Sequence, residues 1–131
     1  MDNSQLFRRI VFSILISNTD DHLRNHGFLR ATRGWRLSPA FDLNPDPETP
    51  GNLSTAIDFG DNSADVRLAL DNAEYFGLDA STARTMVTEV EQATRHWRQT
   101  AIALGLAPGE INLMASAFDT QQREFARRLG A

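Results

Sequence analysis

The sequence has no cysteine and no lysine in its 131 residues. Without cysteine the chain can form neither a disulfide framework nor a thiolate metal site, and redox chemistry does not constrain its compartment. Each of its 13 basic residues is therefore an arginine. No lysine is present to anchor a nucleotide phosphate, and no Gly-x-Gly-x-x-Gly loop occurs to cover one. A complete nucleotide-gripping unit is thus excluded from this sequence.

Basic charge and long apolar runs are also scarce. The net charge of -4 argues against direct binding to nucleic acid, which depends on clustered cations. The apolar stretch at residues 10–16 is far shorter than the roughly 20 residues that span a bilayer, and no small-residue cleavage site follows it. We expect one domain with its own core, compatible with the cytoplasm and without membrane contact.

The hydrophobic pattern predicts a mainly α fold. A buried first helix, capped by Asn3 or Ser4, is indicated by apolar residues at helical spacing: Leu6, Phe7, Ile10, Val11, Ile14 and Leu15. Further helices are expected at residues 64–75 after a Ser63 cap, 81–104 after a Ser81 cap, 110–118 and 120–129. The last of these is expected to expose Arg123, Arg127 and Arg128, and His96 is expected to be a partly exposed structural residue.

One small β-hairpin is expected among these helices. Residues 27–31 and 35–38 have strand-like composition and are separated by residues 32–34, which include Gly34 as the turn glycine. Residues 44–62 are rich in proline, glycine and acids, which predicts an irregular loop, with a short strand at residues 53–59. This loop is either an ordinary surface connection or a segment where a protein substrate docks.

A polar segment before the hairpin carries the most specific chemistry. It reads Asn18-Thr19-Asp20-Asp21-His22-Leu23-Arg24-Asn25, and Phe41-Asp42-Leu43 follows the hairpin. In protein kinases a catalytic aspartate is followed five positions later by a magnesium-binding asparagine, and a second aspartate binds magnesium beyond a hairpin. Asp20, Asn25 and Asp42 have that order. One carboxylate and one amide oxygen suffice for Mg²⁺ that also binds phosphate and water.

These residues, with Leu37-Ser38-Pro39-Ala40 before Phe41 and the helical remainder, resemble the C-terminal lobe of HipA-like serine/threonine kinases, the toxins of bacterial toxin-antitoxin pairs. The resemblance implies that Asp20 is the catalytic aspartate, that Asn25 and Asp42 hold Mg²⁺ and ATP, and that His22 positions the loop. Arg24 stands where the family usually has lysine. Arginine keeps the charge that neutralises a developing phosphate, although its planar fork differs from a compact ammonium.

The resemblance also implies what the chain needs from others. Too few residues precede Asp20 for an N-terminal lobe, so residues 1–131 are expected to be a single C-terminal lobe whose ATP-gripping half is absent. The chain would be a truncated gene, a split subunit or an excised piece, with weak or partner-dependent ATP binding. The implied partners are an N-terminal lobe or full-length kinase, a HipB-like DNA-binding antitoxin and a protein substrate.

Other interpretations of the same residues remain open. Asp58-Phe59-Gly60 spells the magnesium-binding tripeptide of eukaryotic kinases, but it lies too far from Asn25 for one simple hairpin. A metal-dependent hydrolase would instead group acids and histidines around zinc or manganese: Asp20, Asp21, His22 and His26. A noncatalytic regulator would keep the surface of the lobe and dock an antitoxin or a full-length kinase. Asp and Asn in this segment could also serve only as loop and cap residues.

Overall fold

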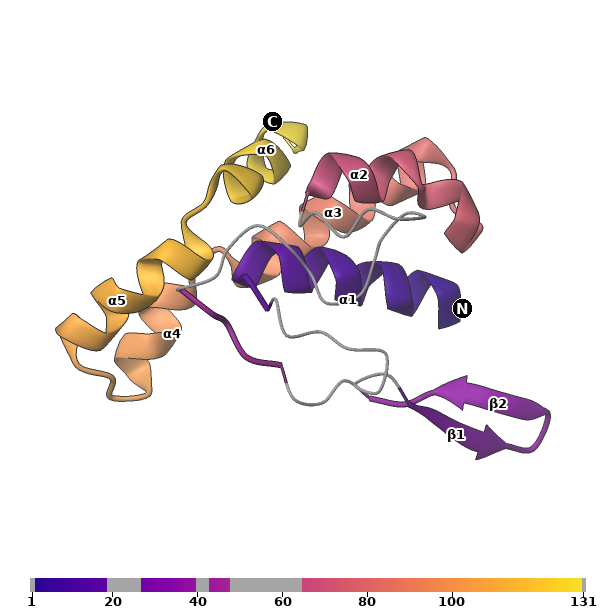
Figure 1. Ribbon diagram of the computed structural model, residues 1–131, viewed down its shortest axis with the longest axis horizontal. Helices are drawn as coiled ribbons and strands as arrows, with labels where there is room; N and C mark the ends of the chain where they lie inside the picture. The colour runs from indigo at the N-terminus through magenta and orange to yellow at the C-terminus, as the bar shows by residue number, and fades with distance from the viewer. Residues whose placement is uncertain (1, 19–26, 40–42, 48–64, 131) are drawn as a thin grey trace.

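A computed structural model of the chain describes residues 2–18, 27–39, 43–47 and 65–130. This part is mainly helical, with one antiparallel hairpin, as the sequence predicts (Figure 1). Its first helix, α1 (Asp2–Ile16), runs through the middle of the molecule, and the hairpin of β1 (Phe28–Ala31) and β2 (Gly34–Leu37) projects from one side. Among the described helices none is long and apolar enough to cross a membrane.

The core forms around α1 because its apolar residues recur on more than one face. Phe7, Val11 and Leu15 are completely buried, and Ile10 and Ile14 nearly so. They pack against α2 (Val66–Asp71), the short 3₁₀ helix η2 (Ala73–Phe76) and α3 (Ala80–Thr94). The β-branched residues of α1 are poor helix formers in isolation, so this enclosure supplies the stability of the helix.

The helix boundaries correct several predicted caps. Helix α1 already begins at Asp2, so Asn3 and Ser4 lie inside it. Asp65 caps α2 and Asp79 caps α3, each by accepting a hydrogen bond from a backbone N–H in the first turn. Ser81 lies inside α3, and Ser63 lies outside the described residues. Aspartate is as good an N-cap as serine, so composition alone did not separate these neighbours. Gly77 ends η2 in the left-handed conformation at a φ of 72°, as predicted.

The prediction of one long helix at residues 81–104 is wrong, because the helix is interrupted at Arg95 and His96. It continues as α4 (Trp97–Ala103), which packs against α5 (Pro108–Phe118). The Trp97 ring stacks on Phe118 with 4.5 Å between centroids, and its indole N–H donates to Asp119 over 3.0 Å. Arg98 also bonds Asp119, at 2.6 Å. These contacts stabilise the interruption between α3 and α4. Local hydrophobic periodicity does not predict it, because the contacting residues are distant in the sequence.

Arg123 on α6 (Gln121–Leu129) is buried, which corrects the prediction that it is exposed. Its guanidinium donates to three backbone carbonyls near helix C-termini: Phe118 at 2.6 Å, Leu15 at 3.3 Å and Glu91 at 3.5 Å. These carbonyls belong to α5, α1 and α3. Helix C-termini leave carbonyls without helical partners, so one arginine satisfies groups from three helices at once.

The charge of Arg123 is balanced by Glu91, which is 0% exposed. The two side chains approach to 3.9 Å, and Arg95 bonds the same carboxylate at 2.6 Å. Burial alone would raise the pKa of Glu91, but the hydrogen bonds and charge of Arg95, with the charges of Arg123 and Arg127, hold that pKa below its ordinary value. Burial lowers the pKa of Arg123. An arginine still stays protonated at neutral pH, so the pair is ionic.

Replacing Arg123 with Met should lower the free energy of unfolding by about 3 kcal/mol, because Glu91 loses a buried partner and three helix ends lose a donor. The matched control is Arg128→Met on the same helix, where the side chain is 78% exposed. That change should stay within about 0.5 kcal/mol of the unmodified chain. Urea unfolding followed by circular dichroism measures both, and equal effects would contradict the role given to Arg123.

Candidate functional site

The predicted site residues lie outside the described residues. Asp20, His22, Arg24 and Asn25 belong to residues 19–26, and Asp42 belongs to residues 40–42. The residues of the alternative interpretations lie there too or in residues 48–64: Asp21, His26 and Asp58. The structure describes the residues that flank the first segment, residues 19–26, and the second segment, residues 40–42.

The first segment leaves the helical body at a fixed point, the end of α1. Ser17 has a φ of 59°, and its hydroxyl donates to the carbonyl of Ala117 at 2.6 Å. A serine at positive φ costs conformational energy, which surrounding contacts must offset. Asn18 follows and is 1% exposed, with its backbone N–H on the carbonyl of Ser13 and its amide nitrogen 3.2 Å from the Ser13 hydroxyl. The residue before position 19 is therefore held on several sides.

The residues that follow the second segment bond to the same point at the end of α1. The side-chain oxygen of Asn18 accepts the backbone N–H of Asn44 at 3.3 Å, and the carbonyl of Ser17 accepts that of Asp46 at 2.9 Å. Pro47 is tied further along, because its carbonyl accepts the hydroxyl of Ser116 on α5. Residue 18, before the first segment, thus adjoins residue 44, which follows the second.

The hairpin joins the other two ends. Strands β1 and β2 pair in the register Phe28 with Leu37 through Ala31 with Gly34, and Gly34 makes the turn at a φ of 117°. At the base of the hairpin the N–H of Ser38 donates to the carbonyl of Gly27 at 2.7 Å. The carbonyl of Ser38 accepts Arg9 of α1. Residue 27, after the first segment, thus lies close to residue 38, just before the second.

Residues 19–26 and 40–42 therefore start and finish at the same two anchoring points. One point is the pair Asn18 and Asn44, and the other is the pair Gly27 and Ser38. The predicted hairpin, whose expected purpose was to return the chain toward Asn25, is confirmed by its register. This bracketing allows side chains from both segments to converge on one ligand.

Asn18 and Arg123 hold the end of α1 in place, and the sequence did not predict this role for either residue. Asn18 opens the polar segment, and its place there was the only signal of its role. Arg123 lies just behind the end of α1, where it bonds the carbonyl of Leu15. No pattern indicated its burial, since its partners Glu91 and Leu15 are 32 and 108 positions away.

Magnesium is the metal that the predicted ligands fit. Asn25 and Asp42 supply an amide oxygen and a carboxylate, which are the hard oxygen donors that Mg²⁺ prefers. In the part of the chain that the structure describes, no group of three or more histidines and acids is placed to hold a metal ion. His96, the histidine that is described, is exposed at the start of α4 and makes no side-chain capping bond.

Comparison with known proteins defines the class. The family model of the HipA-like C-terminal domain matches residues 1–97, which include α1, the hairpin and α3. The chain therefore belongs to the HipA-like C-terminal domain family. A curated relative from Sinorhizobium fredii (strain NBRC 101917 / NGR234), named "Putative kinase Y4dM", is 30% identical over 95 residues. The aligned part is 71% of this chain and 23% of that relative, so the chain spans only a fraction of the relative's length.

Replacing Asn18 with Ala should loosen the join between the two segments, because the N–H of Asn44 loses its acceptor. A buried hydrogen-bonded side chain of this kind stabilises the fold by about 1 to 3 kcal/mol. Amide hydrogen exchange should speed up at Asn44 and Asp46 more than in α4, and the exposed Asn112→Ala variant should exchange like the unmodified chain. Unchanged exchange at Asn44 in Asn18→Ala would show that Asn18 does not hold the second segment.

Proposed function

We propose that this chain is the catalytic C-terminal lobe of a HipA-like serine/threonine protein kinase. The observation that carries the proposal is that the two segments containing Asp20, Asn25 and Asp42 share both anchoring points, in a chain that belongs to this family. The relative from Sinorhizobium fredii, which is longer than this chain, is named a putative kinase, and this name supports kinase activity in a protein that contains such a domain. The lobe transfers the γ-phosphoryl group of ATP to a protein hydroxyl once an N-terminal lobe completes the site.

Each predicted residue has a distinct part in that reaction. Asp20 orients the substrate hydroxyl and accepts its proton as the oxygen bonds the γ-phosphorus and the bond to the departing ADP oxygen breaks. Asn25 and Asp42 would hold Mg²⁺, which neutralises phosphate charge when bound. Arg24 stabilises the negative charge that develops on the transferred group, and His22 holds the loop in position. The substrate gains one phosphoryl group, and ADP is released.

The missing lysine makes the activity dependent on a partner. Kinases of this type pair a lysine and a glycine-rich loop with the ATP phosphates, and this sequence has no lysine and no Gly-x-Gly-x-x-Gly motif. An N-terminal lobe, in the same longer protein or in a separate subunit, supplies them. The kinase completed by that lobe would act in a bacterial toxin-antitoxin pair with a HipB-like antitoxin. The same absence favours a second candidate, a noncatalytic module that docks an antitoxin or a full-length kinase.

Replacing Asp42 with Asn should weaken magnesium-dependent ATP binding by about tenfold, because a metal-bound carboxylate is lost. Calorimetric titration of the purified chain with ATP, with and without magnesium, measures this affinity. Asp58→Asn is the matched control and should bind ATP like the unmodified chain. If Asp58→Asn weakens binding and Asp42→Asn does not, the metal ligand is Asp58. If the unmodified chain alone does not bind ATP, the titration is repeated with an N-terminal lobe supplied, and no binding in that complex would favour the noncatalytic module.

Replacing Asp20 with Asn should lower phosphoryl transfer by about 100-fold or more in a complex that supplies the N-terminal lobe, because the hydroxyl loses its proton acceptor. Magnesium-dependent ATP binding should remain nearly unchanged in this variant. Transfer from labelled ATP to a protein hydroxyl, with ATP affinity measured on the same preparation, separates the two effects. Equal transfer by the variant and the unmodified chain would remove Asp20 from the catalytic role.

A further inference from the structure

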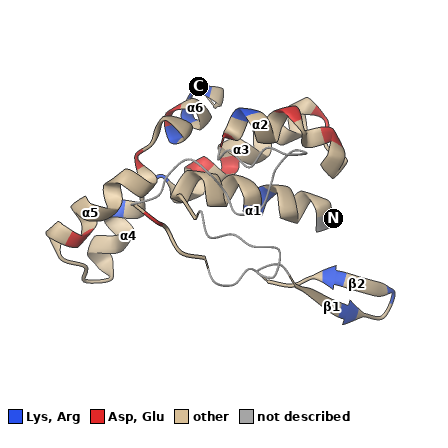
Figure 2. Cartoon of the chain, in the orientation of Figure 1, with Lys and Arg blue, Asp and Glu red and all other residues tan. Residues whose placement is uncertain are grey.

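An open cavity of about 1060 Å³ lies between α1, α3 and the hairpin. Four arginines are among the residues that line it: Arg8, Arg9, Arg30 and Arg36. No acidic residue belongs to the described lining. Figure 2 shows the same imbalance, because the hairpin is coloured for basic residues and for no acidic ones, although the chain as a whole is acidic. The cavity is therefore a local concentration of positive charge.

Arg9 and Arg36 have guanidinium donors without a partner among the described residues. The Nη2 nitrogen of Arg9 donates to the carbonyl of Ser38, but its Nη1 nitrogen is buried and has no hydrogen-bond partner among the described residues. A buried donor left unpaired costs free energy, so it calls for an acceptor. The side chain of Arg36, whose backbone pairs with Leu29, makes no hydrogen bond or ion pair with a described residue. Arg8 differs, because it pairs with Glu89 at 3.1 Å.

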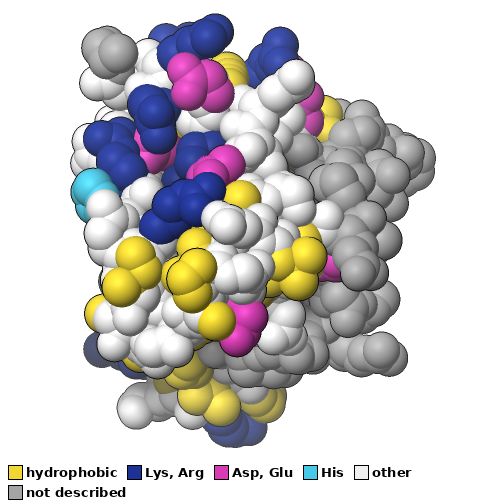
Figure 3. Space-filling model, turned by 90° about the vertical axis from the view of Figure 1, so that its left-hand side faces the viewer, with side chains coloured by type: hydrophobic (Ala, Val, Ile, Leu, Met, Phe, Trp, Pro, Cys, Tyr) yellow, Lys and Arg dark blue, Asp and Glu magenta, His cyan; other side chains and the backbone are white. Residues whose placement is uncertain are grey.

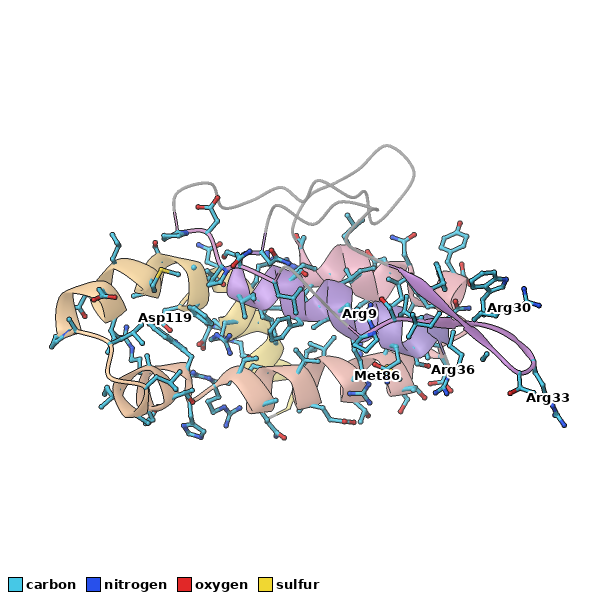
Figure 4. The ribbon with its side chains drawn as sticks, turned by 90° about the horizontal axis from the view of Figure 1, so that it is seen from below. Arg9, Arg30, Arg33, Arg36, Met86 and Asp119 are labelled. Carbon is cyan, nitrogen blue, oxygen red and sulfur yellow. The ribbon has the colours of Figure 1, made fainter. Side chains whose placement is uncertain are left out.

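The two arginines come from different elements that meet at the base of the hairpin. Arg9 is on α1, and Arg36 is on β2 opposite Leu29. Because neighbouring residues of a strand alternate between faces, Arg36 and Leu29 lie on one face and Arg30 and Trp35 on the other. Figure 4 shows Arg9 and Arg36 near the base of the hairpin, whereas Arg33 lies at its far tip. Arg33 does not line the cavity.

We propose that this cavity is a binding site for a phosphate monoester group, held by Arg9 and Arg36. A guanidinium fork is saturated by the two oxygens of a single carboxylate, whereas a phosphate dianion offers three acceptor oxygens and more charge to two forks at once. The group belongs either to a phosphorylated side chain or to a small nucleotide. The proposal goes beyond the kinase activity and does not depend on it, since it uses neither Asp20 nor Asp42.

Titration of the ¹⁵N-labelled chain with inorganic phosphate, without magnesium, tests the site by nuclear magnetic resonance. Chloride at matched ionic strength is the reference for general screening. We expect phosphate-specific shifts in the side-chain signals of Arg9 and Arg36, and an affinity about tenfold lower for Arg36→Gln. Arg36→Lys, which keeps the charge but not the fork, should recover only part of it. Arg33→Gln is the matched control and should bind as the unmodified chain does.

The outcomes separate this site from the proposed nucleotide site. Loss of phosphate binding in Arg36→Gln but not in Asp42→Asn supports the proposal, and the reverse pattern overturns it. Equal weakening by Arg33→Gln and Arg36→Gln also overturns it, because the effect would then be diffuse electrostatic attraction. An absence of phosphate-specific shifts overturns it as well. Parallel titrations with phosphoserine and AMP identify the source, since the bound monoester should be the one that competes best with phosphate.

Discussion

The buried guanidinium of Arg123 is the contact on which the arrangement of the helices depends. It bonds carbonyls near the ends of α1, α3 and α5, and its charge is balanced by the fully buried Glu91. A charge removed from water is tolerated only with such partners, so the three helices that supply them must meet α6, which carries Arg123, in one way.

Figure 3 views the end of the molecule formed by α4 and α5, where apolar side chains remain exposed. Apolar packing is therefore less complete at this end than around α1.

This arrangement matters for function because α1 ends beside Arg123 and then leads into the polar segment. The last turn of α1 is bonded through Leu15, and Ser17 is fixed on α5 through the carbonyl of Ala117. Asn18 then accepts a hydrogen bond from the backbone of Asn44, two residues after Asp42. A phosphoryl-transfer site needs its groups held in place before the substrate arrives, since most of its catalysis is positioning and electrostatics. The helical body is thus suited to holding two short segments at shared points.

Sequence patterns predicted the elements that are determined by residues close together in the chain. The first helix followed from apolar periodicity, and the hairpin followed from two short strands around Gly34. The break before Trp97 and the burial of Arg123 could not be predicted, because their causes are the distant residues Phe118, Asp119 and Glu91. An arginine on a polar C-terminal helix looks solvated until its partners are known. The site residues were chosen by order and spacing, and they stay predictions because they lie outside the described residues.

We propose that residues 19–26 and 40–42 meet in one metal–nucleotide site between their shared anchoring points. Manganese can replace magnesium on ATP, and its unpaired electrons broaden nearby amide signals in nuclear magnetic resonance spectra. Addition of manganese–ATP should broaden the amides of Asn18, Gly27, Ser38 and Asn44 together, while those of Ile102 and Leu113 in α4 and α5 remain sharp. Broadening at only one of the two anchoring points, or strongest in α4 and α5, would contradict the account.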